Sequence, residues 1–177
     1  MTDSSSLSSF SRQVASVVSG KKPPLDQWNP SYCGDIDMAI RADGSWWHEG
    51  REIKRPALVR LFASILRREA DGYYYLVTPV EKCRVDVKLH PLVVVDVDVV
   101  KTEGDGALML TLNTGGQVPL NVSYPLALEP RAANAAFVNL DNGLSALFSR
   151  AAWYRLVEMA DENGCIFSAG QRISLLP

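Results

Sequence analysis

The sequence predicts a mixed α+β protein in which two packed halves of largely antiparallel sheet repeat one motif of hairpin, helix and strand. Short segments that alternate apolar and polar residues, separated by glycine-containing turn signals, indicate strands. Two stretches in the body of the chain have apolar residues at helical spacing, and their sequences match each other. The 177 residues suffice for one larger domain or for two small ones that share a core.

Residues 1–22 predict an amphipathic helix followed by a linker. Apolar residues recur there at helical spacing, with serines on the opposite side, at Leu7, Phe10, Val14, Val17 and Val18. Gly20 ends the helix, and two prolines stiffen the linker. Because the polar face carries almost no positive charge, we expect this helix to dock onto the protein or onto a partner rather than onto a membrane surface.

The N-terminal half is expected to span residues 23–90. A strand is predicted over residues 35–40, and Asp43-Gly44 predicts a tight hairpin turn after it. Pro56 then stands where the first residue of a helix belongs. Helical spacing follows at Leu58, Leu61, Phe62, Ile65 and Leu66.

The segments after this helix predict a run of strands that continues into the C-terminal half, residues 91–177. The expected strands are residues 73–78, 81–87, 92–100 and 107–113. The second and third of these are expected to form an antiparallel pair around His90-Pro91. Residues 118–128 are interrupted by proline and are expected to form an edge strand or a loop.

Two segments far apart in the chain share the pattern R-x-A-x-x-R-L-apolar, at residues 55–62 and 150–157. A hairpin signal precedes each segment, the second being Asn142-Gly143, and a glycine with an apolar strand follows each. Because order, turn chemistry and helix pattern agree, we interpret these segments as parts of a duplicated unit. Neither helix can bury its apolar face alone, so we expect the two halves to pack tightly together.

Charge and hydropathy exclude several classes of partner. The formal net charge is −2 and the pI is about 5.7, so the chain lacks the basic field that holds nucleic acid. No apolar run approaches the length of a membrane span, and the N-terminus lacks the positive start of a signal peptide, so we expect a cytoplasmic protein. The three widely spaced cysteines predict reduced side chains rather than disulfides or a zinc site, at Cys33, Cys83 and Cys165.

Two pairs of aspartates stand two residues apart on predicted strands, so both carboxylates of a pair project from one face. The pairs are Asp35 with Asp37 and Asp96 with Asp98. Together they have the oxygen ligands that Mg²⁺ or Ca²⁺ prefers. The predicted antiparallel pairing instead places Arg84 opposite Asp96 and Lys82 opposite Asp98, as cross-strand ion pairs. We favour these ion pairs and predict no metal site, while the first aspartate pair has no equally obvious partner.

The chain has two histidines that could act as imidazole bases. His90 precedes a proline in a predicted turn, where a structural or solvated role is expected. His48 follows two tryptophans, and no serine-, cysteine- or metal-based catalytic motif accompanies it. We therefore lean towards no enzymatic activity and expect no cofactor. The alternative is a small hydrolase or transferase that uses Asp35, Asp37 and His48.

Arginines of the two predicted helices are candidates for holding an anionic ligand, because guanidinium forks suit phosphate. The repeat places them at equivalent positions: Arg55 and Arg60, and Arg150 and Arg155. The alternative is a solvated helix face or ion pairs between the halves. Trp46 and Trp47 are strand neighbours that point to opposite sides, so one of them could cover a cleft between the halves and stack on a planar ligand.

Several motifs of the chain are shared with one known family. In the first half they are Trp28-Asn29-Pro30, Cys33-Gly34-Asp35-Ile36-Asp37, Asp43-Gly44 with Trp46, Arg55-Pro56 with Leu61-Phe62, and Leu76-Val77-Thr78-Pro79-Val80-Glu81. In the second half they are Asn142-Gly143-Leu144 and Tyr154-Arg155-Leu156-Val157. With these motifs the chain resembles the bacterial DUF1285 family, a domain of unknown function, over nearly its whole length beyond the N-terminal helix.

The resemblance implies a duplicated core whose C-terminal half is loosely like a pleckstrin-homology fold. It also implies a ligand site in the cleft between the halves, for a nucleotide-like molecule in signalling.

We therefore expect a cytosolic ligand-sensing or adaptor protein, in signal transduction, that binds a nucleotide-like molecule between its halves. The candidate binding residues are Asp37, Trp47, His48, Arg55, Arg60, Glu81 and Arg155. A further alternative is an interaction module that recruits a partner through the N-terminal helix. A homodimer would cover an edge left by the Val-rich strands. Nucleic acid and membrane are not expected as partners.

Overall fold

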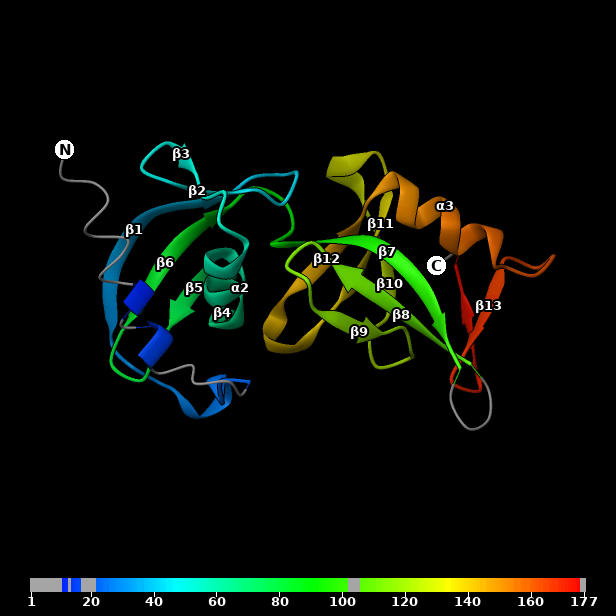
Figure 1. Cartoon of the computed structure of the whole chain (residues 1–177), viewed down its shortest axis with the longest axis horizontal. Coiled ribbons are helices and arrows are strands. Elements are labelled where there is room, and N and C mark those ends of the chain that lie inside the picture. Colours follow the sequence, from blue (N-terminus) through cyan, green and yellow to red (C-terminus); the bar gives the residue numbers. More distant parts are fainter. Residues whose placement is uncertain (1–10, 13, 17–21, 102–105, 176–177) are drawn as a thin grey trace. The chain divides into compact units, whose positions relative to one another are not determined.

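The computed structural model describes residues 11–12, 14–16, 22–101 and 106–175. The chain divides into an N-terminal unit, Met1–Lys88, and a C-terminal unit, Leu89–Pro177 (Figure 1). Each unit is built around its own six-stranded sheet. No helix in the described part of the chain is long and apolar enough to cross a membrane.

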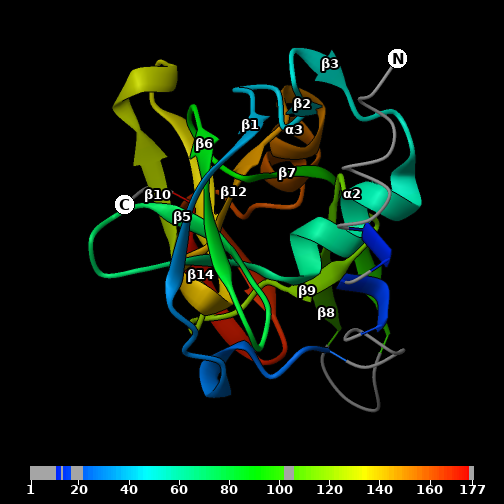
Figure 2. The ribbon, with the colours of Figure 1, turned by 90° about the vertical axis from the view of Figure 1, so that its left-hand side faces the viewer.

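The N-terminal unit contains two three-stranded meanders joined through their first and last strands. Its elements are η1 (Leu25–Gln27), β1 (Tyr32–Ile40), β2 (Trp46–His48), β3 (Arg51–Glu52), α2 (Pro56–Ser64), β4 (Leu66–Arg68), β5 (Tyr74–Val77) and β6 (Lys82–Val87). The sheet order is β3-β2-β1-β6-β5-β4. The central pair, β1 and β6, is parallel, and all other pairs in this sheet are antiparallel (Figure 2).

Helix α2 begins as predicted at Pro56, which follows an extended Arg55. It buries Phe62, whose ring stacks on Trp46 with 6.2 Å between ring centroids. The predicted helix continues to Leu66, but the helix ends at Ser64. Leu66 is instead the first residue of β4, opposite Leu76, so its burial reflects a strand that follows the helix directly.

The C-terminal unit repeats this sheet topology. Its strands are β7 (Leu92–Val100), β8 (Ala107–Leu112), β9 (Gln117–Pro119), β10 (Leu126–Glu129), β11 (Ala135–Asn139), β12 (Ser145–Phe148), β13 (Cys165–Ser168) and β14 (Gln171–Ser174). Its helices are η2 (Pro130–Ala132), η3 (Asp141–Gly143) and α3 (Arg150–Glu158). The sheet order is β10-β11-β12-β7-β8-β9, with a parallel central pair, and β13–β14 form a separate hairpin.

The predicted α+β class and its duplication are confirmed, because both sheets consist of two meanders joined by a parallel pair of first and last strands. The helices that share the R-x-A-x-x-R-L pattern occupy different places in this topology. Helix α2 connects the two meanders of its unit, whereas α3 follows the second meander. Both helices bury one narrow apolar face, which explains their similar sequences.

The predicted antiparallel pairing of residues 81–87 with 92–100 is wrong. Strand β6 pairs with β1 and β5, whereas β7 pairs with β8 and β12. The segment around His90 is therefore not a hairpin turn, since it lies where the C-terminal unit begins. Residues 118–128 do lie at sheet edges, because β9 and β10 are the outermost strands of their sheet.

Part of the N-terminal helix lies within the described residues. Residues 11–12 and 14–16 are helical, and Val14 is fully buried. This turn therefore packs onto the chain itself. Leu7, Phe10, Val17 and Val18 of the predicted helix lie outside the described residues.

A candidate ligand-binding cleft on the N-terminal unit

A row of charged and aromatic side chains crosses the N-terminal sheet. In register, Arg67 of β4 lies opposite Tyr75 of β5, Tyr75 opposite Arg84 of β6, and Arg84 opposite Asp35 of β1. Residues directly opposite one another in a sheet share a face, so these four side chains lie on the same side. Tyr73 stands two residues before Tyr75 and belongs to this side as well.

Arg84 is fixed by two neighbours. Its Nη2 donates a hydrogen bond of 2.5 Å to Asp35 Oδ2, and its guanidinium lies 4.8 Å from the ring centroid of Tyr73. The Tyr32 hydroxyl donates to the other oxygen of Asp35. The hydrogen bonds from Tyr32 and Arg84 lower the pKa of Asp35. The hydrogen bond between Tyr32 and Asp35 also raises the pKa of Tyr32.

Arg84 has N–H groups to spare. A guanidinium carries five N–H donors, and one hydrogen bond, to Asp35, is made among the described residues. Asp35 and Tyr73 therefore orient the Arg84 guanidinium and leave some of its N–H donors for a ligand.

A cleft of about 500 Å³ opens beside this arginine. It forms where β1 and β6 lose regular pairing, between the Asp35–Arg84 and Ala39–Asp86 partners. Such an irregularity leaves backbone unpaired and bends a strand away from its neighbour. Tyr73, with 53% of its surface exposed, stands at the rim.

The rim is shaped by the tight turn between β4 and β5. Gly72 has a φ of +84°, a conformation that glycine adopts without steric cost. Asp71 Oδ1 accepts a hydrogen bond of 3.0 Å from the Tyr73 amide, and Asp71 Oδ2 accepts one of 2.7 Å from the Tyr75 hydroxyl. This bond, together with burial, raises the pKa of Tyr75 to about 12.

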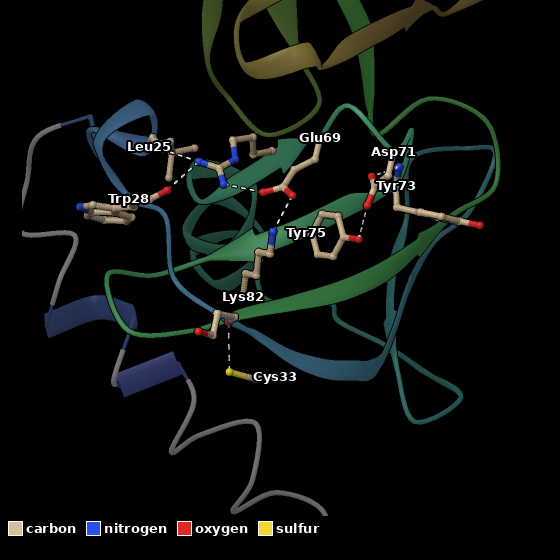
Figure 3. A network of polar contacts seen from close by, with 10 residues as sticks. Leu25, Trp28, Cys33, Glu69, Asp71, Tyr73, Tyr75 and Lys82 are labelled. Atoms are coloured by element: carbon tan, nitrogen blue, oxygen red, sulfur yellow. Dashed lines mark hydrogen bonds and ion pairs between the residues drawn. The ribbon is translucent and has the colours of Figure 1, made fainter.

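Glu69 holds the other end of the row in place (Figure 3). Its carboxylate accepts hydrogen bonds from Arg67 at 2.5 Å and from Lys82 at 2.6 Å, and Lys82 lies over the ring of Tyr75. Burial acts to raise the pKa of Glu69, but these two bonds outweigh burial and lower it. Arg67 also donates to the carbonyls of Leu25 at 2.6 Å and Trp28 at 2.9 Å, which ties η1 to the sheet.

Three of the predicted binding residues lie on β1, which lines the cleft, or on its neighbour β2. Asp37 follows Asp35 on the same exposed face, whereas His48 lies opposite the buried Met38 and so belongs to the other face. The structure therefore does not bring His48 together with Asp35 and Asp37. Trp47 is half-buried, and the guanidinium of Arg41 covers its ring at 3.4 Å.

The other predicted binding residues are scattered. Arg55 and Arg60 are exposed, at the start of α2 and within it, and Glu81 is half-buried in the turn before β6. Arg155 lies on α3 of the C-terminal unit and pairs with Asp96, the residue expected to pair with Arg84. None of the seven predicted binding residues lines the cleft.

Tyr73 and Arg84 were not predicted from the sequence as cleft residues. The signal for Tyr73 was its place directly after the turn residues Asp71-Gly72, because turns run over the protein surface. Arg84 carried no local signal, since its partner Asp35 is 49 residues away and reaches it only through the parallel pairing.

A second polar cluster lies buried in the C-terminal unit. His90 Nδ1 is 2.7 Å from Ser145 Oγ, and His90 Nε2 is 3.1 Å from Glu129 Oε2. Glu129 also accepts two hydrogen bonds of 2.9 Å from the Arg131 side chain. All three residues at the centre of the cluster are more than nine-tenths buried, so His90 has the structural role that its sequence position allowed.

In the part of the chain that the structure describes, the cysteines and acidic residues form no further centre. All three cysteines are free, and burial raises the pKa of Cys83. Among the described residues, no group of three or more His, Cys, Asp or Glu side chains has the arrangement of a metal site.

Comparisons with known proteins agree with this architecture. The N-terminal domain of DUF1285, a domain of unknown function, matches residues 23–89, and the DUF1285 C-terminal domain matches residues 91–173. A crystal structure of a DUF1285 family protein from Silicibacter pomeroyi DSS-3 is 37% identical, with a TM-score of 0.82, over 96% of this chain and 93% of that one. One from Shewanella baltica OS155 is 28% identical, with a TM-score of 0.57, over 70% of this chain and 91% of that one. No curated protein matches the sequence.

Proposed function

Because this chain belongs to the DUF1285 family, whose domains are described without a function, we propose that it is a non-catalytic ligand-binding protein. Its ligand is a nucleotide-like small molecule in the cleft beside Arg84 and Tyr73. The observation that carries this proposal is the oriented guanidinium of Arg84, which retains N–H donors at a cleft of about 500 Å³. That volume falls in the range of small-molecule sites, roughly 300–1,000 Å³.

The geometry around Arg84 suits an anionic group. An arginine already held by a carboxylate and an aromatic ring loses little side-chain freedom when it binds, which favours affinity. The carboxylates that line the cleft are themselves paired, Asp35 with Arg84 and Asp86 with Lys88. A phosphate or carboxylate that enters the cleft therefore meets no unpaired aspartate on its lining.

The planar part of the ligand is proposed to stack on Tyr73. One side of its ring faces the Arg84 guanidinium, and more than half of the residue is exposed. Aromatic stacking adds about 0.5–1.5 kcal/mol beyond the area that is buried. An aromatic ring and an anion on one small molecule describe the nucleotide-like class.

A role in signal transduction, a cytoplasmic location and a pleckstrin-homology-like C-terminal half belong to the same proposal. The order of elements in the C-terminal unit, two meanders followed by α3, supports the last point. The seven residues expected at a site between the halves remain predictions, and so does recruitment of a homodimer or a protein partner.

Thermal denaturation of the full chain against nucleotides, dinucleotides and phosphorylated metabolites tests the proposal. A ligand at about 100 times its Kd stabilises by about 2.7 kcal/mol, which for a chain of this size raises the Tm by roughly 5–10 °C. Arg84→Lys keeps the charge but removes the planar fork, and we expect at least about a tenfold loss of affinity. The matched control is Arg51→Lys, at an exposed arginine of β3. Equal affinity of Arg84→Lys and wild type, or no shift with any compound, would refute the cleft as the site.

A further inference from the structure

The C-terminal unit carries an apolar groove that has no part in the proposed cleft. It has a volume of about 560 Å³, and its lining residues belong to the end of β7, the start of β8, the residue that follows α3 and the β13–β14 hairpin. The lining side chains are almost all apolar, chiefly Val99, Leu108, Met159, Ile166 and Phe167.

The floor of the groove is firmly held. Ile166 and Leu108 are buried, and the Leu108 amide donates a hydrogen bond of 3.0 Å to Ser168 Oγ. The Ala169 amide donates one of 3.0 Å to the Gly106 carbonyl. The hairpin is thereby fixed to the start of β8, so the groove is a preformed feature.

The rim, by contrast, exposes large apolar side chains to solvent. The exposed fractions are 63% for Phe167, 57% for Val99 and 38% for Met159. A single exposed apolar residue is ordinary, but several gathered around one groove mark a binding surface. Phenylalanine and methionine are also enriched in protein interfaces, and methionine adapts its shape to its partner.

Two acidic residues lie close in sequence to the rim residue Met159. Glu158 precedes Met159 directly and Glu162 follows it by three residues, and both are exposed. Neither forms an ion pair within the described part of the chain. The C-terminal unit as a whole has five basic and nine acidic residues, an excess of four negative charges, whereas the chain as a whole has −2.

We propose that this groove binds a basic, amphipathic segment of a partner protein. Its apolar side chains enter the groove beside Phe167 and Met159, and its lysines or arginines lie near Glu158 and Glu162. Charge complementarity selects this occupant, because an acidic rim repels acidic peptides and anionic lipid surfaces. This site is independent of the cleft at Arg84.

Fluorescence anisotropy with two labelled synthetic peptides tests the proposal on the full chain. One peptide places leucine at helical spacing with lysine elsewhere, and the other replaces every lysine by glutamate. We expect the lysine peptide to bind, more weakly as salt rises, and the glutamate peptide not to bind. Phe167→Ser combined with Met159→Gln should weaken binding at least about tenfold, and Glu158→Gln with Glu162→Gln should reduce the salt dependence.

The matched control is Val80→Ser, which removes an apolar side chain that is 71% exposed on the other unit. The variants concern exposed side chains, so unchanged thermal denaturation should confirm that they fold. Lysine-peptide binding that survives Phe167→Ser with Met159→Gln would mean adhesion to surface charge alone and would overturn the proposal. So would equal binding of both peptides, binding of neither, or self-association in sedimentation that the groove variants abolish, which would identify a second copy as the occupant.

Discussion

His90 Nδ1 lies 2.7 Å from Ser145 Oγ, at the centre of a polar cluster that is buried inside the C-terminal unit. Because a buried polar group is costly when it has no partner, this contact matters to stability more than to chemistry. His90 also lies at the first residues of its unit, so it ties the start of β7 to β12 and to the end of β10.

His90→Ala should destabilise the C-terminal unit. The substitution leaves Ser145 and Glu129 without their shared partner, and an unpaired buried group costs about 1–3 kcal/mol. Urea denaturation at pH 7 measures the loss. His48→Ala is the comparison, because the His48 side chain is also mostly buried, at 11% exposed, but its contact with Glu49 is long, at 3.9 Å. A larger loss for His48→Ala than for His90→Ala would contradict the assignment of His90 as the structural histidine.

Glu129 should make stability depend on acid pH. Hydrogen bonds from Arg131 lower its pKa from 4.5 to about 2 in the folded state. A depressed pKa means that the folded state binds this proton less readily than the unfolded state. The Glu129 carboxylate therefore contributes to the stability of the fold above about pH 4.5. This contribution is lost as the pH falls from there towards about 2.

The denaturation midpoint should therefore decrease as the pH is lowered from 6 to 2. In Glu129→Gln this decrease should be smaller. Glu158→Gln is the control, because that carboxylate is exposed on α3 and forms no ion pair among the residues described. If both variants follow the wild-type acid profile, Glu129 does not contribute through its charge.

The sequence predicted the elements of each unit better than their pairing. Turn signals such as Asp43-Gly44 and the apolar spacing around Phe62 are local, and both were found where expected. Pairing of β6 with β7 was expected because the two strands are neighbours in sequence. The actual partner of β6 is β1, a non-local parallel pairing that no local pattern encodes.

The same reason limits what the sequence could say about the cleft. Asp35 was noticed as a carboxylate without an obvious partner, and that partner is Arg84. Tyr73 was expected as the first residue of a strand over residues 73–78, and the structure shows that it is exposed beside the turn at Gly72. Identification of the cleft required the register of β1, β5 and β6, which only the structure supplies.

Phe62 should be a major contributor to the core of the N-terminal unit. It is fully buried and stacks on Trp46, so Phe62→Ala removes both apolar burial and an aromatic contact. We expect a loss of about 3–5 kcal/mol, measured by urea denaturation. Phe167→Ala, at a ring that is 63% exposed, should change the free energy of unfolding by less than about 0.5 kcal/mol. Similar losses for the two variants would show that Phe62 does not anchor α2 to the sheet.

Arg67 should hold η1 against the sheet. Its guanidinium donates to two main-chain carbonyls, of Leu25 and Trp28, while Glu69 balances its charge. Arg67→Ala removes all of these bonds at once, whereas Arg67→Lys keeps the charge but lacks the planar fork that reaches two acceptors. We expect both variants to raise hydrogen exchange at residues 25–28, with a smaller rise for lysine, and to leave exchange in β5 nearly unchanged.

Arg68→Ala provides the control, because Arg68 is exposed and contacts Gly72 and Tyr74 instead. Since hydrogen exchange reports local opening rather than global unfolding, unchanged protection at residues 25–28 in Arg67→Ala would mean that the burial of Leu25 alone holds η1 in place.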